Sequence, residues 1–434
     1  MWILAVVAGL VLVLANAMRI EGACSANYLA QQQAAAVESG AIQYVLAHLD
    51  GLNGTVPDEA EMPCQGVQVG DGVFWVIRPD PDNNADIAYG VVDEAAKISL
   101  NAAPLEVLSE LPDIPPEVAA AIVDWRDPDS DLTVGGAESE YYLLLSDPYE
   151  CKNAPFETVE ELLLVKLADR ALLFGEDINR NGRLDDNEND ADETDPPDDH
   201  DGELDAGLYH LVTVYSAEPN TDASGEPRIN VNTAGPRELN ERLGESLSGA
   251  RLQAVLERIT LGRPFENILD FYFRTGMKME EFSPIADAVT TDTQQQFRGL
   301  INVNTAPAKV LSCLPGLEDS DVTSLIASRS SETAQTASIA WVAEALPQAK
   351  AVALAPYITA RSYQFSADIV SIAGSGRAFR RCRIVVDAGV SPPRLIYRQD
   401  LTALGWPLDE EIRRQLRAGL SVDAVIEATG QEVF

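Results

Sequence analysis

One short motif occurs three times in this chain, each time ahead of a helical pattern. It reads Ile-Ser-Leu-Asn-Ala-Ala-Pro at 98–104, Ile-Asn-Val-Asn-Thr-Ala at 229–234 with Pro236 close behind, and Ile-Asn-Val-Asn-Thr-Ala-Pro at 301–307. Apolar residues at helical spacing follow each copy. An extended start, an Asn/Thr turn able to cap a helix and an early Pro predict a strand, a turn and a helix in every copy.

The first and third copies continue into a second helical pattern, through Leu-Pro-x-Ile/Leu at 111–114 and 314–317. This is the layout of a helix-hairpin-helix, which commonly grips nucleic-acid backbones through hairpin amides and nearby cations. The 69 acidic and 31 basic residues, however, give a formal net charge of −38. Because phosphate binding depends on Lys and Arg, we expect the hairpins to be packing modules.

The amino-terminal residues predict one continuous helix. Residues 2–18 carry no charge, and Arg19 ends the run, which is close to the roughly 20 residues that span a membrane. Further along, apolar residues recur at the i, i+3, i+4, i+7 spacing of an amphipathic helix: Ile42, Val45, Leu46 and Leu49. A helix over 2–49 would be roughly 70 Å long, with one half in lipid and the other on a globular domain. A plain single-pass anchor is the simpler alternative.

Two separated groups of strand patterns predict one small β domain that is divided in the sequence. Residues 67–77, rich in β-branched and aromatic side chains, predict a hairpin turning at 70–72, and 85–92 forms a second run. Strand patterns return late in the chain, at 363–372, 378–386 and 394–398. The region between the two groups is mostly helical.

These patterns predict an α+β fold in which an inserted helical domain interrupts the β domain. The expected parts are an amino-terminal helix, a first β segment, a helical insertion, a second β segment and a helical extension, at 1–50, 51–97, 98–356, 357–400 and 401–434.

The most acidic stretch of the chain, 176–205, holds 14 Asp and Glu against 2 Arg. Within it, 177–188 matches the 12-residue calcium loop, with side-chain oxygens at positions 1, 3, 5, 9 and 12 and Gly182 at the sharp turn. Arg183 would contribute its carbonyl. The predicted side-chain ligands are Asp177, Asn179, Asn181, Asp185 and Glu188. Ca²⁺ prefers six to eight oxygens on such a loop, so we expect it to bind here.

Two further acidic stretches are candidate cation sites. One resembles half of a calcium loop, with Asp199, Asp201 and Asp205 in phase, but Leu208 stands where a closing carboxylate is needed. The other contains closely spaced carboxylates in a turn and a fourth soon after: Asp124, Asp127, Asp129 and Glu138. These could clasp a hard cation or form a network of caps and turns, and the residues leave both readings open.

The sequence contains little that indicates catalysis. The three His residues, His48, His200 and His210, form no His-x-x-x-His pair, and no Gly-x-Ser-x-Gly or phosphate-binding Gly loop occurs. We therefore expect no active site.

Five cysteines are too few for a disulfide scaffold, although one or two bridges could form in an oxidising compartment among Cys64, Cys151, Cys313 and Cys382. Cys24 is expected to be unpaired.

Several of these features together resemble the K-type minor pseudopilins of type II secretion systems. They are the membrane helix that runs into an amphipathic one, the interrupted β domain, the repeated Ile-Asn-Val-Asn-Thr-Ala, and Asp-Trp-x-Asp-x-Asp…Gly-Ala-Glu-x-x-Tyr-Tyr from Asp124 to Tyr142. The resemblance extends to about residue 400 and is most specific at 98–142 and 299–317. Family members carry a basic leader with a Gly before the peptidase cleavage point, and this sequence shows neither.

The resemblance implies a type IV pilin-like fold, with a long helix and a small antiparallel sheet, whose inserted domain carries helix-hairpin-helix or SAM-like repeats and Ca²⁺. It also implies a non-enzymatic, single-pass inner-membrane protein with a periplasmic carboxyl-terminal domain. Such a protein would lie at the pseudopilus tip, helping to initiate or cap the filament and to export folded proteins across the outer membrane. Its partners would be the I- and J-type minor pseudopilins, the major pseudopilin and membrane lipid, with no nucleic acid and no small-molecule substrate.

A second class of function stays open from the hairpins alone. A membrane-tethered nucleic-acid-binding protein of the DNA-uptake type would use the same helix-hairpin-helix units. The strongly negative charge separates the two classes, since it disfavours nucleic acid.

Overall fold

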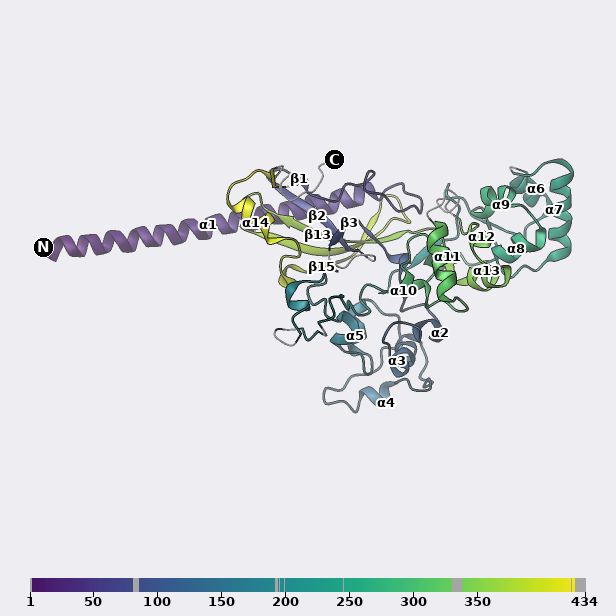
Figure 1. Cartoon of the computed structure of the whole chain (residues 1–434), viewed down its shortest axis with the longest axis horizontal. Coiled ribbons are helices and arrows are strands. Elements are labelled where there is room, and N and C mark those ends of the chain that lie inside the picture. The colour runs from purple at the N-terminus through teal and green to yellow at the C-terminus, as the bar shows by residue number, and fades with distance from the viewer. Residues whose placement is uncertain are drawn as a thin grey trace.

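The computed structural model describes residues 2–80, 86–191, 194, 196–198, 200–244, 246–329, 338–422 and 424–425. A single helix, α1 (Trp2–His48), projects from one end of the molecule (Figure 1). Its first part is exposed, whereas Ile42, Val45 and the following Leu49 are buried. The predicted continuous helix is therefore confirmed. Within the described part of the chain, α1 is the one helix long and apolar enough, by length and composition, to cross a membrane.

An antiparallel sheet packs against the second half of α1. Its main path runs through β1 (Val67–Val69), β2 (Gly72–Pro79), β13 (Gln364–Ile372), β14 (Phe379–Asp387) and β15 (Arg394–Asp400). The short strand β3 (Ile87–Tyr89) pairs with β2, and β4 (Val92–Asp93) pairs with β13. Val69 lies opposite Gly72 in the predicted hairpin, and Val76 opposite Ile369. Strands from both ends of the sequence thus form one sheet, as predicted.

Both faces of this sheet are covered. Alternate side chains of a strand point to opposite faces, so Phe74 packs on the α1 side, whereas Trp75 points to the other side. That second face is covered by the carboxyl-terminal helix α14 (Glu410–Arg417), whose Ile412 and Leu416 are buried against it. The described part of the extension therefore closes the sheet, a role that the sequence analysis did not assign to it.

The insertion between β4 and β13 contains three units, each built on one copy of the repeated motif. A two-residue strand at the start of each unit pairs in parallel with one at its end. These pairs are β5 (Ile98–Ser99) with β6 (Val212–Thr213), β8 (Ile229–Asn230) with β9 (Val289–Thr290), and β11 (Ile301–Asn302) with β12 (Ile358–Thr359). Each unit is thereby fastened at its base by its own short ladder.

Short helices fill the three units. The first contains α2 (Leu105–Leu108), α3 (Pro116–Arg126), α4 (Ser139–Tyr142) and α5 (Arg170–Phe174), with 3₁₀ turns η2 (Val159–Leu164) and η3 (Asp186–Glu188). The second contains α6 (Pro236–Leu243), α7 (Gly249–Gly262), α8 (Ile268–Thr275) and α9 (Met279–Ala286). The third contains α10 (Ala308–Leu311), α11 (Asp319–Arg329), α12 (Val342–Ala345) and α13 (Gln348–Leu354). The remaining elements are β7 (Ala217–Pro219), β10 (Gln296–Arg298), η1 (Glu94–Ala96), η4 (Ala355–Tyr357) and η5 (Thr402–Leu404).

The central Asn of each motif joins two distant parts of its unit. Asn101 donates from Nδ2 to the Phe156 carbonyl (2.9 Å) and accepts from the Phe156 amide at Oδ1 (2.7 Å). Asn232 makes the same pair of bonds with Phe265, at 2.9 and 2.8 Å. Asn304 donates to a main-chain carbonyl 3.2 Å away in the third unit. In all three copies the side chain bonds to main chain far along the sequence.

The prediction that these Asn residues cap the following helices is wrong. The residues at the helix N-caps are Pro104, Gly235 and Pro307, none of which makes a side-chain cap. Each helix begins four residues beyond its Asn, and the Asn amide group is directed across the unit instead.

An arginine at or just after the second helix of each hairpin returns to the turn of the motif. Its guanidinium donates to turn carbonyls in every copy: Arg126 to Leu100 and Ala103, Arg263 to Val231 and Ala234, and Arg329 to Ala306. These cations are therefore directed inward, into the hairpins, whereas gripping phosphate requires them to point outward.

The insertion lies on two sides of the sheet domain. Figure 1 shows α3, α4 and α5 beside the sheet, and α6, α7, α8 and α9 beyond the end of α1 that is farthest from the amino terminus. The bulk of the second unit thus extends the molecule in the direction opposite to the exposed part of α1.

Candidate metal centres

The predicted calcium loop, 177–188, runs from just after α5 into η3, and its backbone folds around one carboxylate. Asp177 accepts the Asn181 amide at Oδ1 (2.9 Å) and the Gly182 amide at Oδ2 (3.0 Å). Gly182 has a φ of +72°, in the left-handed region that favours glycine. Asp177 and Asn181 are buried. The first position of the pattern and its central positions, 5 and 6, are therefore drawn together.

The remaining predicted ligands converge there too. The side-chain amides of Asn179 and Asn181 both donate to Asp185 Oδ2, at 2.7 and 2.9 Å. Arg183 donates its amide to Asn181 Oδ1 (2.7 Å), and its guanidinium pairs with Asp185.

Glu188, at the closing position, is a buried carboxylate that is only partly satisfied by hydrogen bonds. It is only 1 % exposed, and Oε2 accepts the Asp185 amide (3.1 Å). Oε1 has no hydrogen-bond partner among the residues that the structure describes. Burial, together with the charges of Asp177 and Asp185, raises the pKa of Glu188 to about 8. A buried carboxylate oxygen without a donor is costly, and a divalent cation would remove that cost, so the residues fit Ca²⁺.

Two residues that the sequence analysis did not select also contact this loop. His210 Nε2 lies 3.1 Å from Asp177 Oδ2, and Arg381 of β14 donates to the carbonyls of Asn179 and Arg180. Both contacts join residues distant in sequence, so no spacing rule could have indicated them.

The second predicted stretch gains no such support. Asp199 lies outside the described residues. Asp201 accepts the Glu203 amide (2.7 Å) and Asp205 the Gly207 amide (2.9 Å), and both carboxylates are exposed. These bonds account for local turns, and an ion at this stretch stays a prediction.

The third stretch places buried, unpaired carboxylate oxygens around the end of α3. Asp124 Oδ1 accepts the Thr133 amide (3.0 Å), but Asp124 Oδ2, Asp127 Oδ1 and both oxygens of Glu138 have no hydrogen-bond partner within the described structure. Glu138 is 7 % exposed, and the Ser139 amide and the weakly polar Cys151 thiol lie near its carboxylate. Burial and the mutual repulsion of these carboxylates raise the pKa of Glu138 and of Asp127.

This arrangement fits a hard cation better than a network of turns, because a turn network would supply donors to these oxygens. Gly136 lies directly against the cluster, since a Cβ there would be 2.0 Å from Asp124 Oδ2. Asp129, in contrast, is exposed and accepts the Asp131 amide (2.8 Å), as a turn residue does.

Among the described residues, no three His, Cys, Asp or Glu side chains are by themselves arranged to hold a metal ion. Both centres would therefore need amide or main-chain oxygens as well, which Ca²⁺ accepts readily. The cysteines form no disulfide: Cys24 is exposed and free, as expected, and Cys64, Cys151, Cys313 and Cys382 are buried and free.

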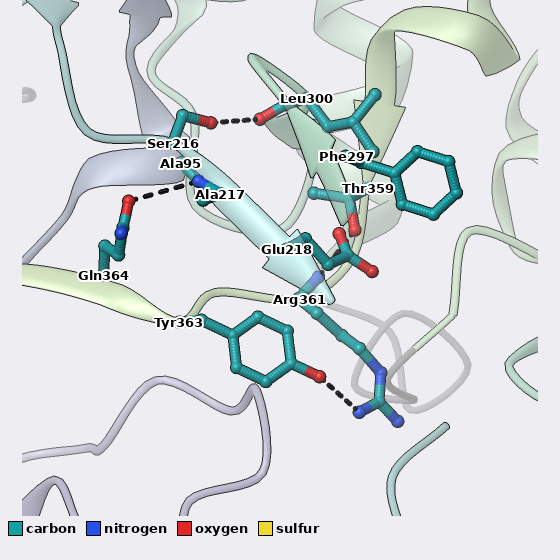
Figure 2. A pocket seen from close by; sticks show the side chains of 10 residues that line it. All are labelled: Ala95, Ser216, Ala217, Glu218, Phe297, Leu300, Thr359, Arg361, Tyr363 and Gln364. Carbon is teal, nitrogen blue, oxygen red and sulfur yellow. Dashed lines mark hydrogen bonds between the residues drawn. The ribbon is translucent and has the colours of Figure 1, made fainter. Parts of the chain in front are cut away.

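A small cavity lies where the insertion meets the sheet (Figure 2). Its volume of about 10 Å³ suits a single water molecule. Arg361 donates to the Tyr363 hydroxyl (3.2 Å), and Ala217 donates its amide to Gln364 (3.1 Å). Glu218 Oε2, on the wall, has no hydrogen-bond partner in the described structure. The cavity is a junction between parts of the molecule and is too small for an organic ligand.

Comparisons with known proteins bear on the two most specific segments. Models of the family described as type II secretion system, protein K, match residues 90–173 and 301–361. No curated protein matches the chain. A solved structure with similarity is that of the GspK-GspI-GspJ complex from the enterotoxigenic Escherichia coli type 2 secretion system, at 14 % identity and a TM-score of 0.36, covering 88 % of this chain and 98 % of that one.

The matched segments contain the first and third motif copies and the carboxylate cluster at the end of α3. Two separate stretches, in order along the sequence, thus match the same protein. In these two segments the chain is similar to protein K of the type II secretion system.

Proposed function

We propose that this protein is a non-enzymatic minor pseudopilin that lies at the tip of the pseudopilus and helps to start or cap the filament. The observation that carries the proposal is the position of the second unit, which extends past the end of α1 that is farthest from the amino terminus (Figure 1). In a filament of parallel amino-terminal helices, the next subunit would be added on that side. The insertion would obstruct this addition.

A deletion tests the capping role directly. Removing residues 102–355 takes away the three units and keeps α1 and every strand of the main sheet. Assembled with the other pseudopilins, this variant should give longer filaments than the full chain, as measured by electron microscopy. Filaments of unchanged length would contradict the proposal.

The exposed apolar surface of α1 supports anchoring in the inner membrane and assembly through helices. We propose the I- and J-type minor pseudopilins, the major pseudopilin and membrane lipid as its partners. Beyond the apolar run, Tyr28 and Leu29 are still exposed on α1. Residues 25–434 should therefore associate with I- and J-type partners at micromolar concentration, measured by size-exclusion chromatography.

Leu29→Glu should weaken this association. Leu261→Glu is the matched control, since Leu261 is 80 % exposed on α7, far from α1, and should leave it unchanged. Failure of the unaltered region to associate with either partner would remove the main support for a tip position.

We also propose two Ca²⁺ centres in the insertion. Asp177, Asn179, Asn181, Asp185, Glu188 and the Arg183 carbonyl would hold one ion, and Asp124, Asp127 and Glu138 would contribute to the other. Bound Ca²⁺ supplies positive charge to carboxylate oxygens that are buried without donors. What supports this proposal is the set of unpaired oxygens on Glu188, Asp124, Asp127 and Glu138.

Calorimetric titration of chelator-treated protein should report two sites. Glu188→Gln and Glu138→Gln should each remove one, whereas Glu203→Gln, an exposed change in the same acidic region, should remove none. Absence of calcium binding by the unaltered protein would overturn the proposal.

Nucleic-acid binding is the weaker candidate. The hairpin arginines Arg126, Arg263 and Arg329 donate to carbonyls of their own turns, and the net charge is −38. We expect no duplex binding in a gel-shift assay at low salt, and salt-sensitive binding would revive this function.

A further inference from the structure

The side of the calcium-like loop that faces away from its predicted ligands rests on the sheet through one buried arginine. Arg381, on β14, is 0 % exposed. It donates from Nη1 to the Asn179 carbonyl (2.6 Å) and from Nη2 to the Arg180 carbonyl (2.8 Å). The same guanidinium pairs with Asp368 on β13, at 2.9 Å from Nε and 2.6 Å from Nη2. One side chain thus joins two strands to the loop.

The two carbonyls that Arg381 binds belong to the third and fourth positions of the loop, which do not offer carbonyl ligands in this pattern. Arg180 has a φ of +57°, a backbone conformation that residues other than glycine seldom adopt. The two bonds hold this segment between Asn179 and Asn181, whose side chains are both predicted ligands. Arg381 therefore fixes the ligand-bearing backbone without occupying a ligand.

Other contacts also hold the loop at 177–188 against the sheet domain. Asn181 donates to the Pro407 carbonyl (3.3 Å), in the extension that follows the sheet. A Cβ on Gly182 would approach Pro79 to 2.7 Å, so the loop lies tight against the end of β2. The ion-binding loop of the insertion is thus in contact with β2, β14 and the carboxyl-terminal extension together.

We propose that Arg381 is the positioning residue of this cation site, and that ion binding in the loop fastens the insertion to the pilin-like sheet. The inference rests on the proposed calcium binding at 177–188. A cation beside a Ca²⁺ site would by itself repel the ion. Asp368 balances the charge of Arg381. Arg381 therefore contributes to ion binding by holding the loop backbone in place, not through its charge.

Trypsin provides a reading specific to this site, because Arg180 and Arg183 both lie within the loop. The full chain is digested over a series of buffered free-calcium concentrations, and the midpoint for protection of the two bonds is measured. In Arg381→Met/Asp368→Leu, which removes both charges together, the midpoint should rise at least tenfold. Arg380→Met is the matched control, since Arg380 is the adjacent residue, is 36 % exposed and pairs with Glu38 instead, and its midpoint should not move.

The outcomes separate this inference from the calcium proposal. If calcium does not protect the loop of the unaltered protein, calcium binding itself fails. If the unaltered protein is protected and the double variant is protected at the same or lower calcium, the positioning role is refuted. Arg381→Lys keeps the charge but cannot donate to both carbonyls and to Asp368. Arg381→Lys should also raise the calcium midpoint. If circular dichroism in chelator shows that the double variant is unfolded, the result for Arg381→Lys decides whether Arg381 has the positioning role.

Discussion

Replacing Asn101 with Ala should destabilise the protein by more than the loss of a helix cap. The Asn101 side chain bonds both the amide and the carbonyl of Phe156, at 2.7 and 2.9 Å, and Phe156 is buried. Each main-chain group left without a partner costs about 1–3 kcal/mol, so for the two groups we expect a loss of about 2–6 kcal/mol. A helix cap would contribute only about 1 kcal/mol. At roughly 2–4 °C per kcal/mol, the value for domains of 150–250 residues, the melting temperature should fall by about 4–24 °C.

Urea and thermal unfolding at fixed calcium would measure the effect. Asn101→Asp keeps an acceptor for the Phe156 amide but sets a carboxylate oxygen against the Phe156 carbonyl, so it should recover part of the loss at most. Asn240→Ala, an exposed change on α6, should stay within about 0.5 kcal/mol. If Asn101→Ala proves no more costly than Asn240→Ala, the reasoning is falsified.

Three further outcomes are expected. Chelation should lower the melting temperature by removing the mass-action stabilisation, about 2.7 kcal/mol at calcium one hundred times its Kd, and unchanged melting curves would exclude this. Gly136→Ala should displace Asp124, since its Cβ would lie 2.0 Å from Oδ2, and calorimetry should then show the loss of one ion. Burial alone would raise the pKa of Glu94, but Lys97 and Arg383 outweigh it and lower the pKa from 4.5 to about 2. The stabilisation from Glu94 is therefore complete above pH 4.5 and lost as pH falls toward 2, so Glu94→Gln should flatten the pH dependence of urea unfolding in that range.

The parts of the fold that local patterns determine were predictable from the sequence. The apolar run and the stripe ending at Leu49 define α1, and the turn at 70–72 defines the first hairpin. The two-residue ladders were not predictable, because a pair such as Ile98 with Val212 has no local periodicity to reveal it. The Asn residues were recognised as important but given the wrong partner, since the choice between a cap and a cross-unit bond depends on where the helix begins.

The two candidate metal centres also differ in how far local sequence patterns could predict them. Spacing along the chain predicted which oxygens belong to the loop at 177–188, and the structure brings Asp177, Asn181 and Glu188 into its buried part. Spacing could not decide between a cation site and a turn network for the cluster around Asp124. The evidence for a cation site there is that several carboxylate oxygens are buried without donors. That property depends on the packing of α3 against residues further along the chain.

The pairing of β2 with β13 dictates the order in which this molecule can become complete. Ile77 lies opposite Asp368, so roughly 300 residues, or about 15–60 s of synthesis at ~5–20 residues per second, separate the two strands. During that interval the apolar strand β2, close in sequence to α1, has an unpaired hydrogen-bonding edge. Such an edge promotes aggregation. The three inserted units, each with its own ladder, can fold in the meantime. The strand β2, which is synthesised early, is consequently among the last to be shielded. The segment that carries α14 then covers the remaining face of the sheet.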